Sequence, residues 1–236
     1  MPLSRGRIFT KDEMDTWNTV LSMHEKTRSQ QVVDVFHSGL ATLNISAEKI
    51  PQLFDINRQL EKSSGFNGVY VSGLENGESF YSLLAKRLFP IGNFIRDKGD
   101  LSYTPEPDII HDLYGHIPFL IDREYADFCQ KIGEVACMFI DNEKKFHQFE
   151  RFFWFTIEFG LIKTDDGPRA FGAGIASSIG ECDFALSGGP EVIDFDIELM
   201  INQEFRIDEM QNKLFILDNK EQLYGCVEEL VQKVNT

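Results

Sequence analysis

Two histidines, His111 and His116, have the residue type and spacing for metal chemistry. They are two of only five histidines in the chain, and they stand five positions apart in the proline-flanked segment 105–118. Imidazole suits iron, zinc, copper or nickel. The same spacing also fits one histidine that caps a helix and another that satisfies a buried polar group. The pair alone therefore leaves both interpretations open.

The local sequence indicates how the two rings would meet. Pro107 and Asp108 can start a helix, because proline has the φ angle of a first helical residue and a carboxylate is favoured at the positive end. Gly115 can end it in the left-handed conformation. In an unbroken α-helix, five residues would turn the rings roughly 140° apart, at about 3.6 residues per turn. We therefore expect a break at Gly115 that brings His116 back toward His111.

A third candidate ligand, Glu158, carries the only formal charge in the apolar run 152–162. An ionised carboxylate inside a buried helix is costly unless it is paired or bound to a metal. A structural ion pair is one alternative, since 23 lysines and arginines are available. Two histidines and one buried carboxylate match the facial triad of non-haem Fe(II) oxygenases. Zinc hydrolases use a similar ligand set, but HExxH is absent from the sequence, so the usual zinc-protease arrangement is missing.

Three longer motifs, in this order, resemble the tetrahydropterin-dependent aromatic amino acid hydroxylases. They are YTPEPDIIHDLYGH at 103–116, WFTIEFGL at 154–161 and FGAGIASSIGE at 171–181. The likeness extends from about residue 9 to about residue 223 and is strongest between residues 88 and 186. It is closest to the short, catalytic-core form typical of bacterial phenylalanine 4-hydroxylases.

The resemblance implies a fold and an organisation for the chain. The fold would be mainly α with a few short strands, as in the catalytic domain of these hydroxylases. Residues 1–236 would form a single catalytic domain, with neither an N-terminal regulatory domain nor a C-terminal tetramerisation tail, and the protein would be a monomer.

The resemblance also implies a reaction. Fe(II) would be held by His111, His116 and Glu158. Tetrahydrobiopterin or a related tetrahydropterin would be the cofactor, and O₂ the co-substrate. The substrate would be a free aromatic amino acid, with L-phenylalanine to L-tyrosine favoured. Tryptophan 5-hydroxylation or a shifted ring position on phenylalanine is an alternative, and a zinc-dependent hydrolase or a catalytically silent amino-acid binding protein belongs to a different class.

Individual positions match the binding residues of the family. On the pterin side Phe80 would stack on the flat heterocycle, and Asp112 would reach the pterin through water. On the substrate side Arg96 would pair both oxygens of the amino-acid carboxylate, and Trp154, one helical turn before Glu158, would stack on the ring. The other matching positions are Gly73, Leu74 and Phe153 for the pterin, and Thr104, Pro105, Ser177, Ser178 and Glu181 for the substrate.

Composition excludes several classes of function. The chain of 236 residues is 42% hydrophobic and 26% charged, as in an ordinary globular protein. A net charge of −15 argues against binding to nucleic acid or to anionic membrane surfaces. The sequence has no apolar run of about 18 residues and no signal-peptide core at its start. Four cysteines without a CxxC pair indicate reduced thiols and a cytoplasmic location.

Periodicity and breaker residues predict the elements that position these side chains. A capping box at 10–13 opens the first helix. A helix from 80 to 88 is expected to end at Pro90, and one long helix to run from 143 to 161. The remaining predictions are helices over 32–40, from 51 to 65, from 122 to 139, over 195–202 and over 223–234, strands over 68–73 and 213–217, and a strand followed by a glycine-rich turn at 169–174.

Overall fold

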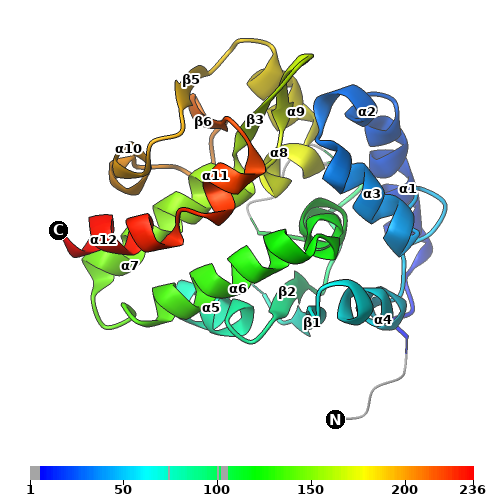
Figure 1. The fold of residues 1–236 in the computed structure, drawn as a ribbon. Helices are drawn as coiled ribbons and strands as arrows, with labels where there is room; N and C mark the ends of the chain where they lie inside the picture. Colours follow the sequence, from blue (N-terminus) through cyan, green and yellow to red (C-terminus); the bar gives the residue numbers. More distant parts are fainter. Residues whose placement is uncertain (1–5, 74, 100, 102–105) are drawn as a thin grey trace.

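The computed structural model describes residues 6–73, 75–99, 101 and 106–236, and most of them lie in helices (Figure 1). The mainly α architecture expected from the sequence is therefore confirmed. The α-helices are α1 (Lys11–Glu25), α2 (Arg28–Gln31), α3 (Asp34–Leu43), α4 (Leu53–Ser63), α5 (Gly77–Leu84), α6 (Arg123–Cys137), α7 (Glu143–Phe153), α8 (Ala173–Ser177), α9 (Ile179–Leu186), α10 (Ile197–Asn202), α11 (Lys220–Tyr224) and α12 (Val227–Asn235).

Three further helices have other geometries. The π-helices are η1 (Ile110–His116) and η3 (Trp154–Glu158), and η2 (Ile117–Ile121) is a 3₁₀-helix. Both π-helices contain candidate metal ligands. Because π-helices are rare and frequently occur at functional sites, their presence here marks η1 and η3 as candidate site elements.

The strands form two small sheets. In one, β1 (Asn67–Val71) pairs in parallel with β2 (Leu88–Gly92). The other has the order β4-β3-β6-β5, from β3 (Leu161–Thr164), β4 (Gly167–Ala170), β5 (Glu191–Asp194) and β6 (Lys213–Leu217). In that sheet β3 runs antiparallel to β4 and parallel to β6, and β5 is also parallel to β6.

Several helix boundaries differ from those predicted. The helix predicted over 80–88 ends at Leu84, and Pro90 lies inside β2 opposite Val69. Proline is tolerated there because β2 has a single neighbouring strand. The helix predicted over 143–161 becomes π-helical at Trp154 and ends at Glu158, so that Leu161 already belongs to β3.

Two other predictions fail for tertiary reasons. Val32 and Val33 lie outside α3, because they are extended where they bridge to Ala170 at the edge of β4. The glycine-rich segment after β4 is helix α8, where a turn was predicted. The capping box at α1 and the strand over 213–217 are confirmed.

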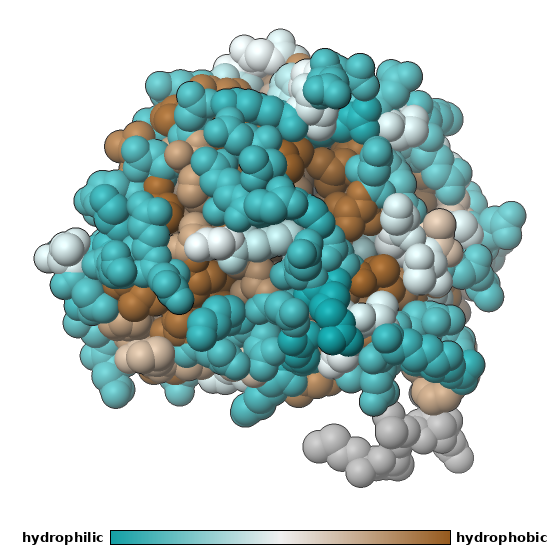
Figure 2. All heavy atoms as spheres, viewed as in Figure 1, coloured by the Kyte–Doolittle hydropathy of each residue, from teal (hydrophilic) through white to brown (hydrophobic). Residues whose placement is uncertain are grey.

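The core is rich in phenylalanine, and it surrounds the two π-helices. Phe119, Phe149, Phe152 and Phe171 are among its largest fully buried side chains. Hydrophilic residues cover most of the face shown in Figure 2, with hydrophobic side chains in small separate areas. Among the described residues, no helix combines the length and the apolarity needed to cross a membrane.

Candidate active site

His111 and His116 share one face because η1 is π-helical, and not because the helix breaks at Gly115. A π-helix bonds residue i to residue i+5, so side chains five positions apart lie about one turn apart on the same face. The predicted break is therefore wrong. Gly115 is needed for close packing, since a Cβ there would lie 3.0 Å from the carbonyl oxygen of Ala173 and from the Cβ of Ser177.

Asp108 fixes the start of η1, as the sequence indicated. Its carboxylate is fully buried and accepts a hydrogen bond from the backbone N–H of His111 at 2.9 Å. It also accepts two hydrogen bonds from the guanidinium of Arg96, at 2.8 and 2.9 Å. Burial tends to raise the pKa of Asp108, but the hydrogen bonds and charge of Arg96 outweigh it and hold the pKa below its usual value.

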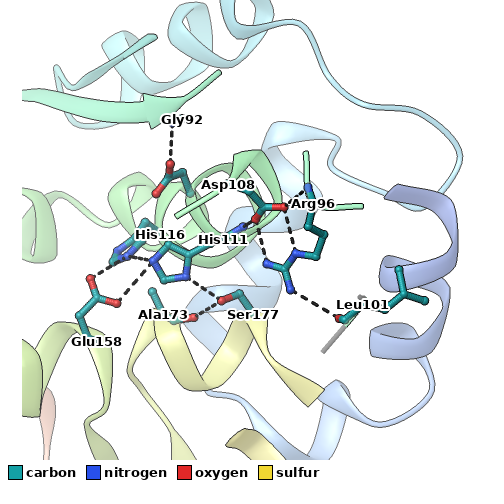
Figure 3. A network of polar contacts seen from close by, with 10 residues as sticks. Gly92, Arg96, Leu101, Asp108, His111, His116, Glu158, Ala173 and Ser177 are labelled. Carbon is teal, nitrogen blue, oxygen red and sulfur yellow. Dashed lines mark hydrogen bonds and ion pairs between the residues drawn. The ribbon is translucent and has the colours of Figure 1, made fainter. Parts of the chain in front are cut away.

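Glu158 is the last residue of η3, and its carboxylate points to the two histidines. The C-terminal end of η3 is packed directly against the start of α8, where a Cβ on Gly172 would lie 2.3 Å from the carbonyl oxygen of Glu158. Only glycine fits at this contact. The close approach brings η3, α8 and η1 together around one point (Figure 3).

The three predicted ligands point toward one another (Figure 3). The Nε2 atoms of His111 and His116 are 3.1 Å apart. Glu158 places Oε1 at 3.0 Å from His116 Nε2 and Oε2 at 3.6 Å from His111 Nε2. Two donors at right angles, each about 2.1 Å from one ion, lie about 3.0 Å apart. The spacing of these three groups therefore fits a single metal ion.

Ser177 selects the tautomer of His111. The Ser177 hydroxyl donates to the carbonyl oxygen of Ala173 at 2.7 Å, and its oxygen lies 3.1 Å from His111 Nδ1. Since the hydroxyl has one proton and has given it to Ala173, it must accept from the Nδ1–H of His111. The lone pair of His111 is then on Nε2, facing Glu158 and His116. Such a partner on the far nitrogen is typical of metal-ligating histidines.

Protonation in the metal-free site follows from burial and from Glu158. Burial lowers the pKa of His111 to about 4, so this ring is neutral at pH 7. Burial also acts to lower the pKa of His116, but the charge of Glu158 raises it above its usual value. For Glu158 burial tends to raise the pKa, and the charge of His116 overcomes this and lowers it. Hence a proton on His116 occupies the position that a cation would take.

Asp112 is the competing carboxylate for a third ligand. It forms a group with His111 and His116 whose donor atoms all lie within 4.8 Å of one another. Its Oδ2 accepts the backbone N–H of Gly92 at 2.7 Å, and burial raises the pKa of Asp112 to about 7. Glu158 is closer to the ring nitrogens and ionises more readily. Glu158 is therefore the better third ligand, and Asp112 lies beside the site.

A cavity of about 240 Å³ opens at these donors. Three of the residues predicted for the pterin, Gly73, Phe80 and Asp112, line it. The ring of Phe80 is held edge-on by Phe89 and Phe153, with centroids 6.0 and 5.3 Å away. Phe153 itself is buried behind Phe80 and supports that ring without lining the cavity. Leu74 lies outside the described residues.

Arg96 also lines the cavity, although Asp108 holds much of its guanidinium. Contacts with described residues use three of its five N–H groups, two on Asp108 and one on the carbonyl oxygen of Leu101 at 3.5 Å. The side chain is 4% exposed, so its position is fixed before any ligand arrives. Asp108 was predicted only as a helix start, and no local pattern indicated its pairing with Arg96.

Trp154 also lines the cavity. Two residues that were not among the predicted site residues hold it in place. Its indole stacks on Phe205, with centroids 4.3 Å apart and planes 14° apart. Its Nε1–H donates to Gln211 Oε1 at 3.0 Å. Both partners lie in the segment 203–212, which also brings Ile207 to the cavity.

The remaining predicted substrate residues divide into three groups. Ser177 and Ser178 line the cavity, and the hydroxyl of Ser178 also caps α9 by accepting the backbone N–H of Glu181. Glu181 is buried behind them and does not line the cavity. Burial raises the pKa of Glu181 to about 7. Thr104 and Pro105 lie outside the described residues.

Comparison with known proteins places this geometry in a family. The family model for biopterin-dependent aromatic amino acid hydroxylases matches residues 6–236. The phenylalanine-4-hydroxylase of Caulobacter vibrioides is 37% identical over 212 residues, which are 89% of this chain and 72% of that protein. A solved structure of the Legionella pneumophila phenylalanine hydroxylase has a TM-score of 0.91 at 35% identity, covering all of this chain and 95% of that one.

The Chromobacterium violaceum phenylalanine hydroxylase, solved with iron(III) and 7,8-dihydrobiopterin, has a TM-score of 0.89 at 32% identity and covers 94% of this chain and 81% of its own. The likeness thus holds in sequence and in fold over nearly the whole chain. This chain belongs to the biopterin-dependent aromatic amino acid hydroxylase family.

Proposed function

We propose that the chain is a phenylalanine 4-hydroxylase that uses Fe(II), a tetrahydropterin and O₂. The observation that carries the proposal is the convergence of His111, His116 and Glu158 in a cavity lined by Phe80, Arg96 and Trp154. The relatives named phenylalanine-4-hydroxylase support the choice of substrate. When bound, iron and the tetrahydropterin together supply the reductive activation of O₂.

Each side chain has a stated task in this proposal. His111, His116 and Glu158 would hold the metal through their ring nitrogens and a carboxylate oxygen. The remaining N–H groups of Arg96 bind the substrate carboxylate, and Trp154 packs against the substrate ring. We assign Thr104, Pro105, Ser177, Ser178 and Glu181 to the amino-acid end of the substrate.

On the pterin side, Phe80 offers the aromatic face on which the heterocycle stacks, with Gly73 and Leu74 beside it. Asp112 holds the pterin's polar edge through water, and Phe153 keeps Phe80 in place. Because most lining residues are apolar, the cavity disfavours water around the reacting centre.

One experiment tests the substrate and the reaction together. Purified protein is supplied with Fe(II), a tetrahydropterin and each aromatic amino acid in turn, and product mass and ring position are determined. Tyrosine from phenylalanine, with pterin-dependent O₂ uptake, is the expected result. Hydroxytryptophan as the main product would reassign the substrate, and hydrolytic activity with zinc and no O₂ uptake would overturn the proposal.

The proposal includes one catalytic domain over residues 1–236 that acts as a monomer in the cytoplasm. The four cysteines are all free thiols, as a reducing compartment would leave them. The net charge of −15 disfavours nucleic acid and anionic membranes as partners. Light scattering on a size-exclusion column measures the mass, for which we expect a value near 27.1 kDa.

A further inference from the structure

Arg28 is a buried charge on the side of α8 away from the cavity. Its side chain is among the largest fully buried ones, and the residue is 2% exposed. None of the ion pairs between described residues includes it. A buried guanidinium without a carboxylate is costly unless other groups satisfy its N–H donors. Its hydrogen bonds therefore deserve a physical explanation.

The guanidinium of Arg28 binds both carbonyl groups that flank Ser177. Its Nε–H donates to the carbonyl oxygen of Ala176 at 3.1 Å, and Nη2 donates to that of Ser178 at 3.0 Å. These carbonyls lie 148 and 150 residues away along the chain, at the C-terminal end of α8. The last carbonyls of a helix have no intrahelical partner, and Arg28 satisfies that of Ala176. The carbonyl oxygen of Ser178 also accepts the backbone N–H of Cys182 in α9, at 3.1 Å.

The planar geometry of arginine explains why this contact orders the segment. Nε–H and one Nη–H lie on the same edge of the guanidinium at a fixed spacing. Binding through that edge fixes the separation of the two carbonyls, and with it the backbone conformation of Ser177 between them. A lysine has no second donor at a fixed distance and could not do this.

Neighbouring polar groups in turn hold Arg28 in position. Nη1 donates to Gln31 Oε1 at 2.6 Å, and Gln31 Nε2 donates to Asp183 Oδ1 in α9 at 3.1 Å. The ring of His37 contacts the carbonyl oxygen of Arg28 through Nε2 at 3.0 Å. Helix α2, only four residues long, is thus tied to α9 through the side chain of Gln31 and to α3 through the backbone carbonyl of Arg28.

We propose that Arg28 is a positioning residue of the metal site, which acts through Ser177 on His111. By fixing the backbone on both sides of Ser177, it keeps the Ser177 oxygen at 3.1 Å from His111 Nδ1. That contact holds the Nδ1–H tautomer and aims the Nε2 lone pair at the metal position. The inference rests on the proposed function for the identity of the metal, but the contacts from Arg28 through Ser177 to His111 do not depend on which substrate is bound.

Three variants and one control test the chain of contacts. Arg28→Met removes the guanidinium but keeps an unbranched apolar side chain, and Ser177→Ala removes the hydroxyl. The third variant combines the two. Arg169→Met is the matched control, since Arg169 is also an arginine near α3 but pairs with the exposed Asp34 and Asp166.

Two readouts are used, neither of which depends on turnover. Long-range ¹H–¹⁵N NMR on the metal-free protein reports the tautomer of His111, and anaerobic competition with a chelator gives the Fe(II) affinity. We expect Arg28→Met to mix the His111 tautomers and to weaken Fe(II) binding about tenfold, the lower end of the range for groups behind a metal ligand. The control should match the wild type in both measurements.

The double variant separates a specific role from general loosening of the fold. If Arg28 acts through Ser177, the double variant binds Fe(II) as Ser177→Ala does, because the two losses do not add. Additive losses, or a wild-type tautomer and affinity in Arg28→Met, would overturn the inference. Should Arg28→Met fail to fold, Arg28→Lys decides in the same way: mixed tautomers and weaker Fe(II) binding support the inference, and wild-type values refute it.

A failure of the proposed function would be recognised separately. If the wild-type protein does not bind Fe(II), the proposed function is wrong, whereas the NMR tautomer of His111 still reports on Arg28. If the wild-type protein binds Fe(II) and hydroxylates phenylalanine but Arg28→Met is indistinguishable from it, only the positioning role is refuted.

Discussion

Two walls of the same cavity are built in different ways. On the metal wall, the donors of His111, His116 and Glu158 come from two π-helices and are fixed by buried hydrogen bonds to Asp108 and Ser177. The rim wall is the segment 203–212 between α10 and β6, which has no helix or strand. It holds Trp154 by stacking and by one amide, and its Ile207 is 45% exposed.

The two walls are built differently because they have different tasks. Metal ligands must be held to a fraction of an ångström, and closely packed helices joined by buried polar bonds provide this. A ring-shaped substrate needs an apolar surface whose position can adjust, and a loop on the protein surface can supply it. We therefore expect substitutions on the metal wall to abolish Fe(II) binding, and substitutions on the rim wall to change how the enzyme binds its amino-acid substrate.

The largest effect is expected at the metal wall. Glu158→Ala removes the acidic ligand and leaves His116 without its ion-pair partner. We expect loss of stoichiometric Fe(II) and a fall in kcat of at least about 10³-fold, measured by metal analysis and by tyrosine formation. In the control Asp112→Asn, iron content should stay near one per chain. If the two variants behave in the opposite way, Asp112 is the ligand.

The second effect concerns the packing that brings the π-helices together. In Gly172→Ala, the new Cβ would lie 2.3 Å from the carbonyl oxygen of Glu158, so η3 or α8 must move. Overpacking of this kind costs about 2–3 kcal/mol, which urea unfolding of the metal-free protein would measure. Gly180→Ala, where the nearest atom is the flexible Cε of Met210 at 3.2 Å, is the control and should change stability little. Equal stability in both variants would contradict the close approach.

A smaller effect is expected at the rim. Phe205→Ala removes the ring stacked on Trp154, and such a pair contributes about 1 kcal/mol beyond its buried area. We expect KM for the amino acid to rise about tenfold with unchanged iron content, measured by steady-state kinetics and metal analysis. Phe205→Leu keeps much of the apolar volume, so its KM should lie between those of the wild type and Phe205→Ala. Loss of iron in Phe205→Ala would show that the walls are not independent.

The smallest effect is a pH dependence of the free energy of unfolding, caused by the buried carboxyl of Glu181. Burial raises the pKa of Glu181 from 4.5 to about 7, so the folded protein binds this proton more tightly than the unfolded chain does. The free energy of unfolding therefore falls as pH rises from about 4.5 to 7, and levels off above. Glu181→Gln removes this loss, so we expect it to be more stable than the wild type at pH 8, and little different at pH 4. The expected gain is about 1 kcal/mol, less than the full pKa shift would give, because solvent partly screens the carboxylate. Urea unfolding at both pH values measures it, and an equal difference at both would refute the assignment.

The metal wall was largely predictable from the sequence, because its residues are chemically unusual for their surroundings. Two histidines in a short segment and one carboxylate in an apolar run marked the three candidate donors, and the resemblance to the family favoured a metal site over a structural ion pair. The sequence could not give the reason they converge. The helix continues through Gly115 with π geometry, and Gly115 packs closely against α8, a tertiary contact that local sequence does not record.

The rim and the supporting contacts were much less predictable. Phe205 and Gln211 are ordinary loop residues until Trp154 is placed between them. Arg28 is likewise one arginine among many in the sequence, and only the fold brings it to carbonyl groups about 150 residues away. Local patterns record burial and periodicity, whereas pairings of this kind depend on tertiary structure.

The most direct test of a single ferrous ion held by these three side chains is a crystal structure of the protein loaded anaerobically with Fe(II), measured at the iron absorption edge. We expect one anomalous peak about 2.2 Å from Nε2 of His111, from Nε2 of His116 and from a carboxylate oxygen of Glu158, with Asp112 outside bonding distance. A peak bound by Asp112 in place of Glu158, or iron located away from both histidines, would contradict the proposed metal site.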